Sequence, residues 1–87
     1  MSTFLSSLRQ FCQAFERVFH EDAKEQRITA SSDEALEEFL QEYAMLMTQM
    51  SGSSVREELV GVEVKMKVLY VWAYAMPVYR RAMRLLQ

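Results

Sequence analysis

The stretch from Val60 to Tyr79 is the most apolar part of the chain and limits the folds open to it. It holds the only Trp, the only Pro and three of the four Tyr. Its longest run without a charged residue is Val68–Tyr79, 12 residues long. A membrane-spanning helix needs about 20 apolar residues, so the sequence predicts no membrane span. These side chains are therefore expected to pack within the fold or against another chain.

At helical spacing, this stretch and the residues from Val55 onward that precede it carry two apolar rows on opposite flanks. We expect the first row to hold the fold together; it comprises Val55, Leu59, Val62, Met66, Leu69, Ala73 and Met76. We expect the second row to face a partner; it comprises Val60, Val64, Val68, Val71 and Ala75. Tyr70, Trp72 and Tyr74 flank these rows, and Tyr and Trp are typical interface anchors. The predicted partner-binding residues are Val64, Val68, Tyr70, Val71, Trp72 and Tyr74. In the alternative, other helices of the same chain cover both rows.

The ends of this helix are predicted from local signals. Ser54 and Glu57 have the spacing of a capping box, which starts a helix. Pro77 lacks an N–H and clashes with the carbonyl four residues earlier, so we expect the helix to end or kink there. A short fourth helix then covers residues 78–86. A strand over Val62–Val68 is the alternative, because apolar and polar residues alternate there, but only residues 27–30 offer a partner strand.

Two further helices precede this stretch. The first starts near Ser2 or Thr3 and carries a stripe of apolar residues: Phe4, Leu5, Leu8, Phe11, Cys12, Phe15, Val18 and Phe19. Residues 21–26 are almost all polar and end it. Ser31 and Glu34 form a capping box for the second helix, which runs to the glycine at position 52. The predicted fold class is all-α, an antiparallel bundle of three long helices plus a short C-terminal helix after Pro77, in one domain over residues 1–87.

The charges are unevenly placed along the chain. The net charge is −2, yet all 12 acidic residues lie at or before Glu63, and five basic residues follow it with no acid. One row of acidic side chains has the spacing of a single face of the second helix and could mimic the charge of a nucleic acid; it comprises Glu34, Glu37, Glu38 and Glu42. Arg80, Arg81 and Arg84 form a possible anion contact near the C-terminus. Ordinary solvation is the simpler interpretation of the acidic face, and for the arginines it is that they complement the C-terminal helix dipole and the acidic second helix.

Catalytic and metal-binding patterns are missing from the sequence. Cys12 and His20 are the only residues of their types and lie about 12 Å apart along one predicted helix, too far for a nucleophile and its base. Glu16 and His20 supply two ligands at most, whereas a zinc site needs three or four. We therefore expect no enzyme activity, no metal and no cofactor. The single Cys and the absence of a signal-peptide pattern predict a cytoplasmic protein.

The sequence leads to two hypotheses about function. The first is a non-enzymatic protein-binding module that occupies a partner's surface, as small inhibitors, adaptors and secretion-type chaperones of bacteria and phages do, and that forms a homodimer. The comparison with such proteins is an analogy at the level of fold. The alternative is a small nucleic-acid-associated regulator that uses the basic C-terminal helix, although the acidic pI of about 5.4 argues against nucleic-acid binding.

Overall fold

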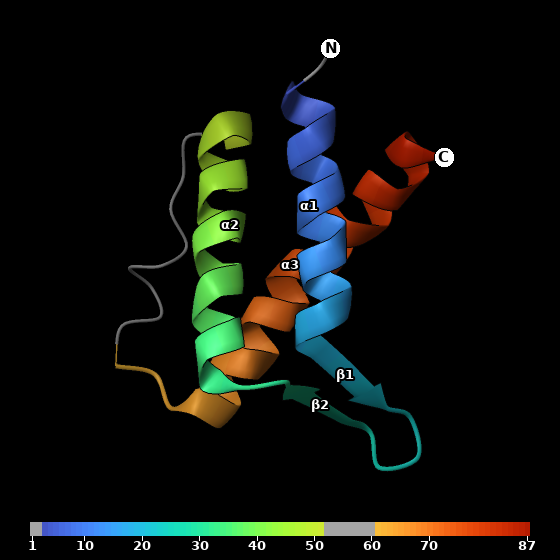
Figure 1. The fold of residues 1–87 in the computed structure, drawn as a ribbon. Coiled ribbons are helices and arrows are strands. Elements are labelled where there is room, and N and C mark those ends of the chain that lie inside the picture. The colour runs from blue at the N-terminus through green and yellow to red at the C-terminus, as the bar shows by residue number, and fades with distance from the viewer. Residues whose placement is uncertain (1–2, 52–60) are drawn as a thin grey trace.

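The structure is a computed structural model that describes residues 3–51 and 61–87. In these ranges the chain forms three helices and one β-hairpin. Helix α1 spans Thr3–Val18, strands β1 and β2 span Phe19–Asp22 and Arg27–Ala30, helix α2 spans Asp33–Ser51, and helix α3 spans Val64–Leu86. Figure 1 shows α1 and α2 running antiparallel side by side, with α3 crossing behind both at an angle. The hairpin extends from the C-terminal end of α1.

The β-hairpin replaces the connecting segment that the sequence predicts between the first two helices. Its strands pair antiparallel, with Phe19 opposite Ala30 and Asp22 opposite Arg27. The carboxylate of Asp22 accepts hydrogen bonds from the amides of Lys24 and Glu25 at 3.0 and 3.2 Å, which tightens the turn. Phe19 anchors the hairpin to the core, where its ring meets that of Phe39 edge-on at 5.1 Å.

Ser31 ties the hairpin to α1 and does not cap α2. Its amide donates a hydrogen bond to the carbonyl of Val18 at 2.8 Å, and its hydroxyl donates to the carbonyl of Arg17 at 2.6 Å. These bonds satisfy carbonyls at the end of α1 that have no partner within the helix. The cap of α2 is Ser32, whose hydroxyl accepts from the amide of Ala35 at 3.0 Å. The predicted capping box that starts at Ser31 is therefore wrong by one residue.

The core lies between the α1–α2 pair and the inner side of α3. The predicted stripes of the first two helices are buried from Leu8 to Phe19 and from Leu36 to Leu46, whereas Phe4 and Leu5 are exposed. Aromatic rings occupy the centre: Phe11, Phe15, Phe19, Phe39 and Tyr43 contact one another at centroid distances of 5.0–6.4 Å. Such aromatic contacts add to the free energy gained by burying their area.

Helix α3 begins at Val64, and Gly61 keeps it from extending to earlier residues. Gly61 adopts a φ of 81°, a left-handed conformation that a continuing α-helix cannot contain. The helix starts at Val64, and its first turn is closed by the amide of Lys67, which donates to the carbonyl of Glu63 at 2.8 Å. The strand alternative for Val62–Val68 is therefore wrong. The predicted capping box at Ser54 lies outside the described residues.

The same helix continues through Pro77 to Leu86, so the predicted break and the short fourth helix are wrong. Proline leaves the carbonyl of Ala73 without its helical hydrogen bond. Ala73 and Pro77 are both exposed, so water can satisfy that carbonyl. Ala75 and Ala82 are buried on either side of the proline and hold both halves of α3 to one core. Packing thus outweighs the local cost of the proline.

The predicted antiparallel bundle of three long helices and a short fourth is corrected on these grounds. The described residues form three helices, the last of which crosses the first two, and a small two-stranded sheet. In the part of the chain that the structure describes, no helix is both long and apolar enough to cross a membrane.

Candidate protein-binding surface

Helix α3 exposes one continuous apolar surface, which we call the α3 outer face and define as Met66, Leu69, Tyr70, Ala73 and Tyr74. At 100° per residue these side chains project from one side of the helix. The four large ones are each 44–49% exposed. Side chains scattered singly at such exposures are ordinary, but a contiguous row on one helix is typical of a contact surface.

Each of the two apolar rows of this helix faces the side that the sequence predicted for the other. Val71 and Val68 were expected to face a partner, yet they are 0% and 6% exposed and belong to the core. Ala75 of the same row is also fully buried. Met66 and Leu69 were expected in the core and are exposed instead. The free surface of the helix therefore includes Met66, Leu69 and Ala73, which the sequence placed inside.

The remaining predicted partner-binding residues are distributed around α3. Tyr70 and Tyr74 are exposed on the α3 outer face. Val64 is exposed at the start of the helix, beside β2, and Trp72 is half-buried against the core. The structure thus brings two of the six predicted residues together on one free surface and separates the other four from it. Met66 and Leu69 belong to this surface and were not predicted there.

A sequence signal for the correct orientation lies beyond Pro77. When the helix is extended, the row of Val68 and Val71 continues through Ala75 to Ala82, whereas the row of Met66 and Leu69 continues to Arg80 and Arg84. Arginine is rarely buried without a charged partner, so the second row must face solvent. In a helix that ends at Pro77, both rows are apolar throughout, and this difference between them is absent.

The basic end of α3 adjoins the α3 outer face. Arg80, Arg81 and Arg84 are all exposed and project from the same side of the helix as Met66 and Ala73. Among the described residues, none of the three forms an ion pair with an acidic side chain. The α3 outer face therefore passes from apolar to positively charged along the helix.

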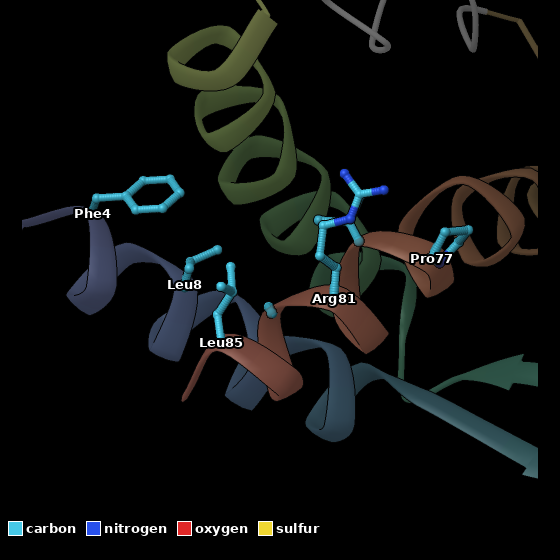
Figure 2. Close-up of a pocket in the computed structure, with 7 residues that line it drawn as sticks. Phe4, Leu8, Pro77, Arg81 and Leu85 are labelled. Atoms are coloured by element: carbon cyan, nitrogen blue, oxygen red, sulfur yellow. The ribbon is translucent and has the colours of Figure 1, made fainter. Parts of the chain in front are cut away.

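A shallow apolar groove of about 120 Å³ lies between this basic end and the start of α1. Its lining residues are Phe4, Leu8, Pro77, Val78, Arg81, Ala82 and Leu85. Figure 2 shows Leu8 and Leu85 close together on facing helices, with Arg81 farther along α3 towards Pro77. Phe4 and Leu85 are exposed. The groove is large enough for one aliphatic side chain, and Arg81 is placed to meet an acid next to it.

The predicted acidic face of α2 is present, but one of its members has a partner. Glu34, Glu38 and Glu42 are exposed. Glu37 accepts a hydrogen bond from the ammonium of Lys67 on α3 at 3.0 Å. This ion pair joins α2 to α3. An uninterrupted row of four free carboxylates is therefore not available.

Buried polar contacts hold α3 at its orientation. The hydroxyl of Tyr43 on α2 donates to the carbonyl of Tyr74 at 3.4 Å. Burial raises the pKa of Tyr43 above its ordinary value of 10.0, and the neighbouring Tyr74 raises it further. At neutral pH this hydroxyl therefore keeps its proton and remains a donor.

Glu16 and His20, which the sequence offered as two possible ligands, have separate partners. Glu16 accepts a hydrogen bond from the hydroxyl of Tyr79 at 2.9 Å. His20 Nε2 lies 2.9 Å from the Ser31 hydroxyl, which already donates its proton to Arg17. His20 therefore donates from Nε2. No group of three metal-ligating side chains forms within the described ranges 3–51 and 61–87.

A second, wider groove of about 400 Å³ separates β2 from the start of α3. Residues 26–30 and Asp33 form one wall, and Val64, Lys65, Val68 and Leu69 form the other. Its walls are mostly apolar, with Arg27, Lys65 and Asp33 as the charged side chains. This groove lies on the opposite side of α3 from Tyr70 and Tyr74.

Comparison with known proteins gives no relative for this chain. No family model, no curated protein and no solved structure matches it.

Proposed function

We propose that this protein is a non-enzymatic protein-binding module whose α3 outer face covers the surface of a partner protein. The observation that carries the proposal is the exposure of Met66, Leu69, Tyr70 and Tyr74 on one side of one helix. Tyrosine supplies a large contact area at low entropic cost and is enriched in binding hot spots. Small inhibitors, adaptors and secretion-type chaperones work by covering a partner in this way.

The charge next to the α3 outer face defines the chemistry of the partner. Arg80, Arg81 and Arg84 extend the surface with positive charge, and no acidic residue lies beyond Glu63 in the chain. A partner segment with apolar side chains followed by acidic residues would complement this face. Its apolar residues would contact Tyr70 and Tyr74, and its acids would steer its approach to the arginines. The groove beside Arg81 would accept one anchoring aliphatic side chain of the partner.

We further propose that the protein acts as a homodimer. An 87-residue chain buries only about 60–65% of the surface that it exposes when unfolded. The chain is 51% apolar, and nine large apolar side chains of the described residues remain exposed. Pairing of two copies would cover part of this surface and leave another part for the partner protein.

A photo-crosslinking amino acid in place of Tyr70 tests the proposal in the cells that produce the protein. The matched control carries the same group in place of Gln41, which is exposed on α2. We expect position 70 to crosslink to one protein that position 41 does not capture. The captured protein is then purified and titrated by calorimetry against the wild type and Tyr70→Ser. Equal crosslinking at both positions, or equal affinity of the two chains, would contradict the proposal.

A second candidate function is supported by the free arginines. Arg80, Arg81 and Arg84 lie exposed on one side of a helix and have no acidic partner among the described residues, an arrangement that suits nucleic-acid phosphates. Salt-dependent binding of duplex DNA or RNA that is lost when all three are replaced by Ala would support this function. Absence of binding at low salt would end it.

A further inference from the structure

The outer edge of β2 carries main-chain groups without a partner. The Ser31 amide donates to Val18 across the hairpin, and alternate residues of an antiparallel strand point their main-chain groups to the same side. Thr29 therefore bonds to β1, whereas Ile28 and Ala30 direct their N–H and C=O groups away from it. Among the described residues, no backbone hydrogen bond outside the helices and the β1–β2 pair reaches Ile28 or Ala30. β2 is thus an open edge at which another strand can be added.

The wider groove lies directly along this edge. Residues 26–30 form its strand wall, and Val64 and Leu69 form much of its helix wall. Both of these α3 side chains are exposed, at 48% and 45%. Ile28 and Ala30 lie half-buried on the face of the sheet that packs against the core. A strand added to the edge would place alternate side chains over Val64 and Leu69.

The sequence of β2 is complementary to that of a second β2 strand paired antiparallel with it. When two β2 strands pair antiparallel about a twofold axis at Thr29, Ile28 of each copy lies opposite Ala30 of the other. These residues carry the free main-chain groups, so four hydrogen bonds form. Arg27 then lies opposite Ser31, and no like charges face one another. The twofold axis also puts Ile28 and Ala30 of both copies on the same face of the sheet.

We propose that a second copy of this chain pairs with β2 and that the two hairpins form one four-stranded antiparallel sheet in the order β1-β2-β2-β1. This inference rests on the proposed homodimer and assigns it a surface. The α3 outer face residues Tyr70 and Tyr74 point away from the groove and remain free for a partner protein. Because each β2 contributes only four residues, the dimer is weak and depends on concentration.

Thr29→Cys in the full chain tests the pairing. Thr29 lies on the twofold axis in a non-hydrogen-bonded pair, where the Cα atoms are about 4.5 Å apart, a distance that a disulfide can span. The matched control is Gln41→Cys. The wild type shows how much covalent dimer forms through Cys12 alone, which is buried. In a glutathione redox buffer we expect Thr29→Cys to form at least ten-fold more covalent dimer than either. Equal amounts in all three chains would overturn the proposal.

Ala30→Pro provides an independent test in the chain without an added cysteine. It removes an outward N–H and leaves the bonds between β1 and β2 intact, since proline is tolerated at strand edges. We expect light scattering to show loss of the wild-type dimer, with an unchanged circular dichroism spectrum. If Ala30→Pro still dimerises and Tyr70→Glu does not, the copies pair through the α3 outer face, which overturns this inference but not the homodimer. A wild type that stays monomeric at millimolar concentration overturns both.

Hydrogen exchange tests whether something other than a second copy covers the outer edge of β2. We expect the amides of Ile28 and Ala30 to become protected as the protein concentration rises. Protection of both amides in a sample that scatters as a monomer would show that something other than a second copy covers β2, and would overturn the proposal.

Discussion

The hydroxyl of Tyr79 donates a hydrogen bond to Oε1 of Glu16 at 2.9 Å, which joins the last helix of the chain to the first. The Tyr79 ring also stacks on Phe15, with the centroids 4.4 Å apart and an interplanar angle of 15°. These two contacts fix the rotation of α3 about its own axis. The rotation in turn decides that Val71 faces the core and that Tyr70 faces solvent.

Stability is expected to fall at alkaline pH, because two buried groups, Cys12 and Tyr43, and the half-buried Tyr79 keep their protons more tightly in the folded chain. Burial raises the pKa of Cys12 above 9.0, and the pKa values of Tyr43 and Tyr79 above 10.0; the hydrogen bond to Glu16 raises that of Tyr79 further. A raised pKa gives stability that is present below the unfolded value and is lost as pH rises through the folded value. Urea unfolding between pH 8 and about pH 11 should show this loss.

Tyr79→Phe measures how much Tyr79 contributes to the loss of stability at alkaline pH. It removes the group that ionises, so we expect a smaller loss of stability at alkaline pH than in the wild type. Tyr70→Phe, at an exposed position, is the control and should follow the wild-type curve. If Tyr79→Phe follows the wild-type curve as well, the contact with Glu16 does not form in solution.

The orientation of α3 is tested by two glutamate substitutions on the two opposite apolar rows of the helix. Val71→Glu places a charge at a site that is 0% exposed, and the cost of several kcal/mol for an unpaired buried ion should unfold so small a domain. Leu69→Glu adds the same group to the α3 outer face and should change stability by about 0.5 kcal/mol or less. Circular dichroism and thermal unfolding measure both. If Leu69→Glu unfolds the protein and Val71→Glu does not, the orientation predicted from the sequence is right.

The core of the first two helices could be predicted from the sequence, because the Phe and Leu spacing leaves one apolar stripe on each of them. Leu8, Phe11, Phe39 and Tyr43 are buried as expected. The orientation of α3 could not be predicted from its apolar rows alone, since both are apolar up to Pro77. The error at Pro77 hid the one difference between them, which is that one row leads to Ala82 and the other to Arg84.

The hairpin was missed for a different reason. Its strands are only four residues long; β1 lacks an alternating apolar pattern, and the alternation in β2 covers too few residues to be a strong signal. The hairpin depends on contacts across the fold, such as Phe19 packing on Phe39 and Ser31 bonding to the end of α1. The Tyr70 and Tyr74 part of the candidate surface was predicted, whereas the part formed by Met66 and Leu69 required the structure.

The two serines before α2 should differ in what they stabilise. Ser32→Ala removes the cap of α2 and should lower the free energy of unfolding by about 1 kcal/mol. Ser31→Ala removes the hydroxyl that His20 and Arg17 share, which should loosen the hairpin and leave α2 intact. Amide exchange by NMR distinguishes the two, since only Ser31→Ala should speed exchange in β1 and β2. Faster exchange in the first turn of α2 for Ser31→Ala would restore the predicted capping box.

The arginines at the end of α3 should set the salt dependence of partner binding. Replacing Arg80 and Arg84 by Ala should weaken binding about three- to ten-fold at low salt and reduce its dependence on ionic strength, because exposed charges contribute up to about 1 kcal/mol each. Arg27→Ala, on β2, is the control and should leave affinity for the partner unchanged. Calorimetry from low to physiological salt measures this, and an unchanged salt dependence in the double variant would exclude a role for the basic end.

Hydroxyl-radical footprinting of the complex with the crosslinked partner tests the central claim most directly, because methionine and tyrosine side chains report their own exposure. Met66, Tyr70 and Tyr74 lie on the α3 outer face, and Met45 on α2 is 66% exposed and serves as an internal control. We predict that the partner lowers the oxidation of the three α3 residues and leaves Met45 unchanged. Protection of Met45, with the α3 residues as reactive as in the free protein, would contradict the claim that the α3 outer face binds the partner.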